Sequence, residues 1–358
     1  MITLGIETSC DETAASVVID GAQDGGRRLL SNVVASSMGW HARYGGVIPE
    51  NAARSHIEVI IPTIKQALRD ADVTFDDIDA IAVTRGAGLS GSLLMGVMTA
   101  RTLSITENKP LYGVNHVEAH LYVNFITESA LPDYDVPGAP PQFPILGIIV
   151  SGGHSQLVLF HNHFDYILLG QTYDDAIGEA FDKVAKLLGM PYPGGVQVSE
   201  LAKSGNPQAF KLPKARLQGR YDFSYSGLKT AVLRLGQELV GKDHTLPSFE
   251  LPKLLSQTQK ADIAASFQRI AVETIVDKAV RACEEFQPAS VIIGGGVAAN
   301  TELRRQLDER LPLPIAYPDR KLCTDNGAMI ATLGSFRHQL GAQPDDPYTL
   351  NIAPNLSM

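Results

Sequence analysis

The chain has 358 residues, of which 44% are hydrophobic, and 30 Lys and Arg against 39 Asp and Glu give a formal net charge of −9. This length suggests two domains of roughly 150 residues, and the apolar content excludes disordered, collagen-like and disulfide-scaffold proteins. Three widely separated cysteines, an odd number, favour free thiols in a reducing compartment. The acidic balance excludes a protein that coats nucleic acid non-specifically, because neutralising phosphates requires Lys and Arg.

The first residues are predicted to form neither a signal peptide nor a membrane anchor. They lack a basic region, and Glu7 and Asp11 interrupt the apolar run. No later stretch reaches about 18 uninterrupted apolar residues. We therefore expect a soluble cytoplasmic protein with no membrane contact.

Short β-branched runs alternate with longer segments of helical periodicity, which is typical of an α/β fold with much parallel sheet. The predicted strands are, in chain order, residues 3–6, 15–19, 30–36, 80–84, 145–150, 156–161, 166–171 and 290–293. The predicted helices are residues 49–71, 90–107, 117–126, 175–188, 260–286, 301–311 and 326–340.

A proline-rich segment, residues 128–144, divides the chain into a first half, 1–127, and a second half, 145–358. The halves resemble each other: residues 4–9 and 146–151 both start with Leu-Gly-Ile and both end a strand in a small polar turn, which another strand follows. Later in each half, a strand runs into a glycine turn and then a helix, at 81–86 and at 291–296. The spacing between matching segments grows along the chain, which indicates an insertion near 190–257. We predict a tandem duplication with an inserted subdomain, although two strands can look alike over six residues by chance.

Three turns at the ends of predicted strands carry small polar residues or glycines. Their free backbone N–H groups, with a helix behind them, can cradle a phosphate, although a glycine after a strand is more often simple turn geometry. The turns are Thr8-Ser9-Cys10-Asp11-Glu12-Thr13, Ser151-Gly152-Gly153-His154-Ser155 and Gly294-Gly295-Gly296-Val297-Ala298-Ala299-Asn300. Neither a P-loop nor a dinucleotide-binding fingerprint closes a strand. Asp11 is a candidate to hold a metal or water near a phosphate, or simply an Asx-turn residue.

The strongest local motif is His116-Val117-Glu118-Ala119-His120. Two imidazoles four residues apart on a helix share one face and can bind one metal ion, although such a pair also occurs on ordinary helix surfaces. A metalloprotease is disfavoured, because its glutamate directly follows the first histidine. Asp325 is a candidate third ligand, or alternatively the N-cap of the following helix.

Two further charged features are less specific. Asp182 lies on a predicted helix and faces away from the i,i+4 pair Glu179–Lys183, so it can reach a ligand. Residues 211–220 hold four cations and no acid, at Lys211, Lys214, Arg216 and Arg220. This basic segment is either a solvated surface or a strip that grips an RNA backbone.

Several motifs together resemble one family, the bacterial TsaD (Gcp) proteins, which are tRNA threonylcarbamoyladenosine transferases in the superfamily of actin, sugar kinases and heat-shock ATPases. The resemblance covers nearly the whole chain. It is carried by Ile6-Glu7-Thr8-Ser9-Cys10-Asp11-Glu12-Thr13, His116-Val117-Glu118-Ala119-His120, Val150-Ser151-Gly152-Gly153-His154, Phe223-Ser224-Tyr225-Ser226-Gly227-Leu228-Lys229-Thr230 and Gly294-Gly295-Gly296-Val297-Ala298-Ala299-Asn300.

The resemblance implies two duplicated α/β halves with an actin-like, ribonuclease H-like fold. It also implies a reaction, in which a threonylcarbamoyl group moves from threonylcarbamoyl adenylate to the exocyclic amine of the adenosine next to the anticodon of tRNA, and AMP is released. It implies one iron or zinc ion on His116, His120 and Asp325. From its place in the first turn, Asp11 is our candidate catalytic residue. The implied substrate-binding residues are Ile149, Val150, Ser151, Gly152, Gly153, Asp182, Gly195 and Asn300.

The resemblance also implies a smaller TsaB-like paralogue and a TsaE-like ATPase as partners. Several relatives carry aspartate where Ser199 stands here, which weakens any expectation of a carboxylate contact to the nucleoside at that position. The fold alone allows an alternative, a nucleotide-binding regulatory ATPase that modifies no RNA. The histidine pair discriminates between the two, because such a nucleotide switch needs no transition metal.

Overall fold

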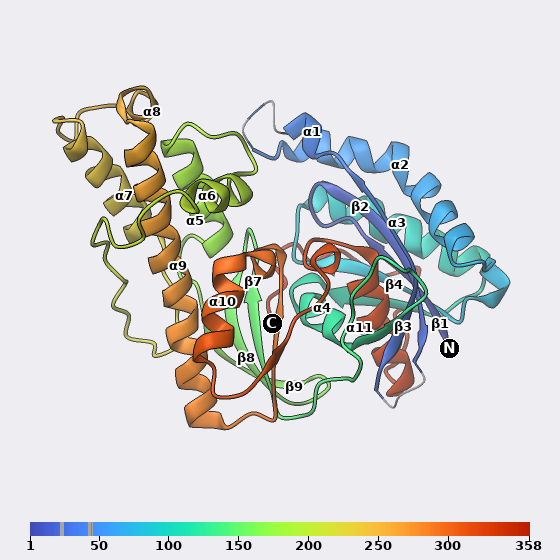
Figure 1. The fold of residues 1–358 in the computed structure, drawn as a ribbon. Coiled ribbons are helices and arrows are strands. Elements are labelled where there is room, and N and C mark those ends of the chain that lie inside the picture. The colour runs from blue at the N-terminus through green and yellow to red at the C-terminus, as the bar shows by residue number, and fades with distance from the viewer. Residues whose placement is uncertain (22–24, 42–43, 45) are drawn as a thin grey trace. The chain divides into compact units, whose positions relative to one another are not determined.

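The computed structural model describes residues 1–21, 25–41, 44 and 46–358. The chain forms two units, Met1–Gln142 with Ala316–Met358, and Phe143–Ile315. The C-terminal segment therefore belongs with the first unit, whereas the sequence grouped it with the second half. The reason is packing: helix α11, Gly327–Gln339, lies against β1, β2 and β4 of the first sheet (Figure 1).

The first unit is built on a six-stranded sheet of order β5-β4-β1-β2-β3-β6. Strands β1, β2 and β3 form an antiparallel meander, while β4 pairs parallel with β1 and β5 pairs parallel with β4. The strands are β1 Ile2–Glu7, β2 Glu12–Asp20, β3 Arg27–Ser36, β4 Ala80–Gly86, β5 Leu111–Asn115 and β6 Ile126–Ser129. The helices are α1 Met38–His41, α2 Pro49–Asp70, α3 Ser90–Thr106 and α4 His116–Tyr122, followed late in the chain by α11.

The core of this unit lies between the sheet and helices α2 and α3. Leu4, Ile6 and Val83 on the strands bury their side chains together with Ile64 and Val97 on the two helices. On α11 the backbone comes so close to the sheet that a Cβ at Gly5 would meet the Gly327 carbonyl oxygen at 2.3 Å. Glycine at residue 5 is therefore required by this close approach.

The second unit repeats the arrangement in a sheet of order β11-β10-β7-β8-β9. Strands β7 to β9 form an antiparallel meander, and β10 pairs parallel with β7 as β4 does with β1. The strands are β7 Ile145–Val150, β8 Ser155–Asn162, β9 Asp165–Gln171, β10 Ser290–Gly294 and β11 Ile315–Ala316. The helices are α5 Ile177–Leu187, α6 Gly194–Ala202, α7 Ser226–Leu239, α8 Leu251–Leu254, α9 Gln257–Phe286 and α10 Thr301–Arg310. The predicted duplicated α/β fold is confirmed.

Most predicted elements lie within a few residues of their observed bounds, and two regions differ. Helix α4 ends at Tyr122, and a 3-10 turn leads into β6, so the helix predicted over 117–126 is too long. The segment 190–257 contains three helices, α6, α7 and α8, that the sequence did not predict. Over the described residues, every helix is too short or too polar to cross a bilayer.

Candidate metal and nucleotide site

The two motif histidines share one face of α4, which begins where β5 ends. Asn115 stops the strand and caps the helix, because its side-chain oxygen accepts hydrogen bonds from the backbone N–H groups of Val117 at 2.8 Å and Glu118 at 3.4 Å. His116 and His120 are both buried, and their ring centroids lie 4.7 Å apart. Glu118 lies two residues from each histidine and so points to the other side of the helix.

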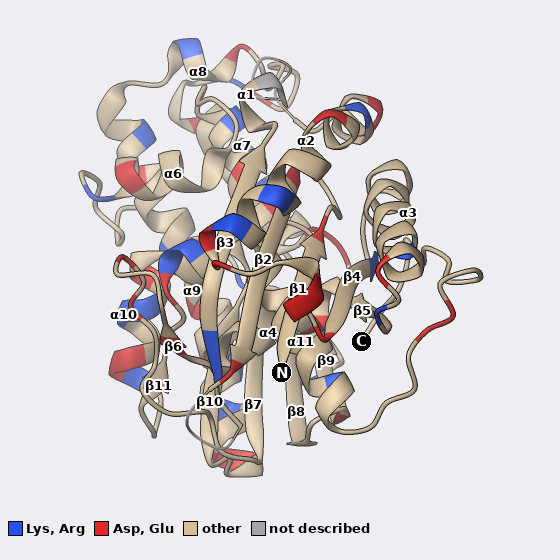
Figure 2. Cartoon of the chain, turned by 90° about the vertical axis from the view of Figure 1, so that its right-hand side faces the viewer, with Lys and Arg blue, Asp and Glu red and all other residues tan. Residues whose placement is uncertain are grey.

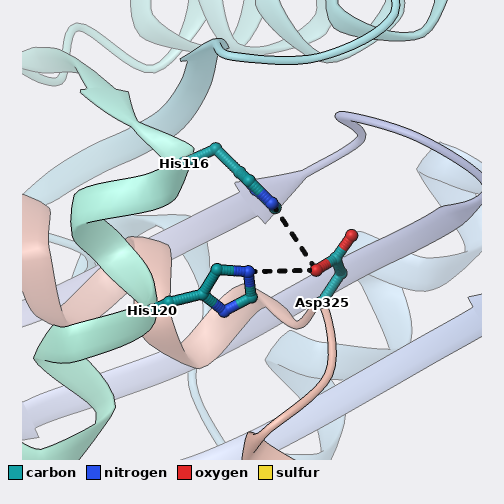
Figure 3. Close-up of side chains that lie close together, drawn as sticks. All are labelled: His116, His120 and Asp325. Atoms are coloured by element: carbon teal, nitrogen blue, oxygen red, sulfur yellow. Dashed lines mark ion pairs between the residues drawn. The ribbon is translucent and has the colours of Figure 1, made fainter. Parts of the chain in front are cut away.

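Asp325 completes the group from the loop before α11. Its Oδ1 lies 3.6 Å from His116 Nε2 and 3.4 Å from His120 Nε2 (Figure 3). Asp325 is not the helix cap, because Asn326 fills that position and accepts the N–H of Met329 at 3.0 Å. One donor atom from each of His116, His120 and Asp325 lies within 4.8 Å of the others, which is compatible with a single metal ion.

A buried carboxylate supports His116 from behind. Glu7 Oε2 lies 3.2 Å from His116 Nδ1, and the Ser9 hydroxyl lies 3.2 Å from the same nitrogen. Glu7 also accepts hydrogen bonds from the Thr84 hydroxyl and the Ser9 backbone N–H. Sequence reasoning assigned no role to Glu7, although a glutamate at the end of an otherwise apolar buried strand was a usable signal.

Burial and mutual charge interactions shift the pKa values of His116, Asp325 and Glu7. Burial lowers the pKa of His116, but the neighbouring carboxylates Asp325 and Glu7 outweigh it and raise the pKa to about 9. Burial raises the pKa of Asp325 to about 6, against the opposing charge of His116. Burial acts to raise the pKa of Glu7, yet His116 and the hydrogen bonds from Ser9 and Thr84 hold it below its ordinary value. A cation is therefore electrostatically favoured between these carboxylates.

Asp11 lies in the loop between β1 and β2 and belongs to the same unit. Its side chain is buried, and its Oδ2 has no hydrogen-bond partner among the described residues. The charge of Asp11 contributes to the raised pKa of Asp325, so the two carboxylates are electrostatic neighbours. A buried carboxylate oxygen of this kind is available to a ligand or a proton.

In the second unit, the turn after β7 is shaped by its own hydrogen bonds. Ser151 N–H donates to the His154 carbonyl at 2.8 Å, and Ser151 Oγ accepts the His154 N–H at 3.1 Å. Side chains added at Gly152 or Gly153 would meet nothing within 4 Å. The fold therefore does not require glycine at these two positions, and the space beside them is open. Ile149 and Val150 end the adjoining strand, with fully buried side chains.

The other predicted substrate residues are tied into the second unit by hydrogen bonds. Asp182 accepts the N–H of Gly194 at 2.7 Å, which fixes the start of α6, and burial raises its pKa. Asn300 caps α10 through Leu303 N–H at 2.9 Å and donates to the Ser199 hydroxyl at 2.9 Å. A cavity of about 570 Å³ adjoins Ser199 between α6, α9 and α10. Gly195, like Gly152, has open space where a side chain would be.

The basic segment 211–220 is partly neutralised within the chain. Lys214 Nζ lies 2.6 Å from Asp277 and 2.9 Å from Glu273, and Arg220 lies 2.6 Å from Glu285. Lys211 and Arg216 are exposed. The four cations are thus not equally available to RNA, which the sequence pattern did not reveal.

The chain is similar to known proteins in sequence and in fold. The model of the TsaD family, tRNA N6-adenosine threonylcarbamoyltransferase, matches residues 28–332. The protein of that description from Thermomicrobium roseum is 48% identical over 96% of this chain and 94% of its own, and the one from Symbiobacterium thermophilum is 47% identical over 100% and 97%. Full-length HypF in its phosphate- and nucleotide-bound form has a TM-score of 0.56 at 14% identity, covering 96% of this chain and 56% of that one, a likeness of fold alone.

Proposed function

The chain belongs to the tRNA N6-adenosine threonylcarbamoyltransferase family, and we propose that it transfers the threonylcarbamoyl group from threonylcarbamoyl adenylate to the exocyclic amine of the adenosine next to the anticodon. In this reaction the amine nitrogen forms a bond to the carbamoyl carbon. The bond from that carbon to the adenylate oxygen breaks, AMP leaves with the electron pair, and the amine loses a proton. The observation that carries the proposal is the high identity to this family over the whole chain, with the His116–His120–Asp325 group intact.

The metal is proposed to be iron or zinc, held by His116, His120 and Asp325. Two imidazoles and one carboxylate form a donor set that suits either ion and leaves coordination positions open. The pairing of His116 Nδ1 with Glu7 fits this role, because a carboxylate behind a metal-binding histidine fixes the ring and its tautomer. When bound, such an ion supplies Lewis-acid polarisation of a carbonyl.

Asp11 is the proposed catalytic carboxylate. Its buried Oδ2 without a hydrogen-bond partner among the described residues is suited to accept the proton that the attacking amine loses. Replacing the carboxylate by an amide removes this acceptor while keeping the side-chain shape. We therefore expect Asp11→Asn to lose transfer activity and to retain the fold.

The adenylate is proposed to bind at Ile149, Val150, Ser151, Gly152, Gly153, Asp182, Gly195 and Asn300. Support comes from the open space beside the three glycines of this set, Gly152, Gly153 and Gly195. Because a glycine has no side chain, a phosphate can approach its backbone N–H group closely. The Asp182 carboxylate also accepts the Gly194 N–H and so fixes the start of α6 beside the proposed binding residues. Ser199 offers a hydroxyl already engaged with Asn300 and with the Gly195 carbonyl at 2.9 Å.

A TsaB-like paralogue and a TsaE-like ATPase are the proposed protein partners. Helices α2 and α3 pack side by side and turn large apolar side chains to solvent, at 62% exposure for Ile57 and 46% for Met98. Helix α3 carries a single charged residue, Arg101, and is mostly tan in Figure 2. An exposed apolar face of this kind is suited to a protein partner, and we assign the TsaB-like paralogue to it. Ile57→Glu with Met98→Glu is expected to abolish that association.

The tRNA is proposed to contact the exposed cations of the basic segment, and a tRNA substrate places the reaction in the cytoplasm. Because Lys214 already pairs with Asp277, the phosphate contacts are assigned to Lys211 and Arg216. Changing both to Ala is expected to weaken tRNA binding and to lower its log–log salt slope by up to roughly one for each phosphate that is no longer neutralised. An unchanged salt slope would indicate that tRNA contacts another surface of the protein.

The direct test is reconstitution. Unmodified tRNA is incubated with threonine, bicarbonate, ATP, the chain and the remaining pathway proteins, and the nucleosides are analysed. Threonylcarbamoyladenosine should appear only when the chain is present. ATP hydrolysis by the chain without a modified nucleoside would favour the regulatory ATPase instead.

A further inference from the structure

A buried histidine on α2 contacts the loop that carries Asp11. His56 is fully buried, and its two ring nitrogens contact the loop and the strand that follows it: Nε2 lies 3.0 Å from the Cys10 carbonyl oxygen in the loop, and Nδ1 lies 2.7 Å from the Thr13 hydroxyl in β2. A carbonyl oxygen only accepts, so Nε2 carries the proton and Nδ1 accepts from Thr13. Burial lowers the pKa of His56, which favours this neutral ring.

These contacts bracket Asp11, with Cys10 directly before it and Thr13 two residues after it. Other elements fix the same backbone: Ser92 of α3 donates its hydroxyl to the Cys10 carbonyl at 2.9 Å, and the Ser37 hydroxyl donates to the Asp11 carbonyl at 2.7 Å. Of these three side chains, His56 alone contacts the chain on both sides of Asp11, at Cys10 in the loop and at Thr13 in β2.

One oxygen of the Asp11 carboxylate, Oδ2, has no hydrogen-bond partner among the described residues. The side chains of Cys10 and Glu12 interact with the carboxylate from within the same short segment, so its direction follows the backbone of residues 10–12. That loop also carries Ser9, whose hydroxyl lies 3.2 Å from His116 Nδ1. A change in the loop therefore reaches both the Asp11 carboxylate and the surroundings of His116.

We propose that His56 is a positioning residue that holds the Asp11 carboxylate toward the His116–His120–Asp325 group through Cys10 and Thr13. The proposal rests on the role that the proposed function gives to Asp11. The hydrogen bonds of His56 go to Thr13 and to the Cys10 carbonyl and to none of His116, His120 and Asp325, so its proposed action is indirect. A displacement of about 1 Å in a catalytic group can cost about 100-fold in rate, so the expected effect of losing His56 is large.

The test begins with His56→Ala and a matched control, Ile64→Ala. Ile64 is buried in the same helix and contacts the core, not the loop, so its truncation costs stability without moving Asp11. With the full set of partners, His56→Ala is expected to lower kcat between about 10- and 100-fold. Its KM for the adenylate should match wild type. Ile64→Ala should lower the melting temperature and leave kcat unchanged.

A conservative variant refines the result. In His56→Gln the side-chain amide can replace Nε2 as donor to the Cys10 carbonyl, so we expect partial recovery of kcat relative to His56→Ala. Equal losses of kcat in His56→Ala and Ile64→Ala would overturn the proposal, since loss of stability would then explain both.

A double-mutant cycle with Asp11→Asn separates this proposal from the proposed function. If His56 acts through Asp11, adding His56→Ala to Asp11→Asn should cause no further loss, whereas additive losses would overturn the link. The cycle is read once as kcat and once as the affinity of the purified chain for Co²⁺. Asp11→Asn should weaken this affinity by removing a nearby negative charge, and His56→Ala should weaken it by displacing that charge. An inactive wild type would contradict the proposed function, while the Co²⁺ cycle would still decide the role of His56.

Discussion

Glu7 and His116 form a buried pair, with Glu7 Oε2 3.2 Å from His116 Nδ1. We predict that Glu7→Gln weakens metal binding by about 10- to 100-fold, the usual cost of removing a carboxylate behind a metal-binding histidine. Titration of the metal-free chain with Zn²⁺ or Co²⁺ measures this. The control is Thr84→Val, which removes one hydrogen bond to Glu7 but keeps the charge, and its effect should be smaller. Unchanged affinity in Glu7→Gln would contradict the assignment.

His116→Ala or His120→Ala should remove the bound metal and most activity while leaving the chain folded, because each variant deletes a ligand from the site. Asp325→Asn should act in the same direction but less severely, since a neutral amide oxygen is a weak ligand. Metal content by elemental analysis and melting temperature are the two measurements. His161→Ala, at an exposed position on β8, is the control and should change neither. Full metal occupancy in the His116 or His120 variant would refute the site.

Metal affinity should rise with pH up to about pH 9. In the metal-free chain, Asp325 and Glu7 raise the pKa of His116 to about 9 despite its burial, so its ring is protonated at neutral pH. A metal binds only the neutral ring, so binding at pH 7.5 must displace a proton. Between pH 7 and 9 the affinity should increase about tenfold per pH unit from this group. Calorimetry in buffers of different ionisation enthalpy counts the protons released, and release of none would contradict the prediction.

Gly153→Ala should weaken binding of the adenylate without destabilising the chain. A Cβ at this position meets no atom within 4 Å, so the fold tolerates it, but the added methyl group occupies space proposed for the phosphate. We expect a loss of about tenfold or more, roughly 1.4 kcal/mol, measured with AMP and a stable adenylate analogue. Gly227→Ala, on α7 with equally open space, is the matched control. If the melting temperature of Gly153→Ala falls together with its adenylate affinity, the turn has a structural role and no role in binding.

The features that could be predicted from the sequence are those set by residues close together in the chain. The His116–His120 spacing, the strand-end turns and the duplicated sheets depend on short-range periodicity, and they were found. Glu7 and His56 were missed because their partners, His116 and Thr13, lie 109 and 43 residues away. The order of strands in the sheet brings Glu7 to His116, and the packing of α2 on β2 brings His56 to Thr13. Asp325 stayed ambiguous because both Asp325 and Asn326 can cap a helix, and only the backbone geometry selects one.

The helices and ion pairs of the inserted segment, residues 190–257, were not predicted for a different reason. Prolines and glycines interrupt the residues between α5 and α9, so no helical periodicity stood out there, even for the 14-residue helix α7. The ion pairs of Lys214 with Glu273 and Asp277 span about sixty residues and were equally invisible. Charge composition therefore overstated how many cations the segment offers to RNA.

The central claim is that this chain performs threonylcarbamoyl transfer with the help of the metal held by His116, His120 and Asp325. The most direct measurement is nucleoside analysis of unmodified tRNA after incubation with threonylcarbamoyl adenylate, the partner proteins and either the metal-loaded wild type or His116→Ala. We predict threonylcarbamoyladenosine next to the anticodon with wild type and at least about tenfold less with the variant. Equal product with both proteins, or none with wild type, would contradict the account.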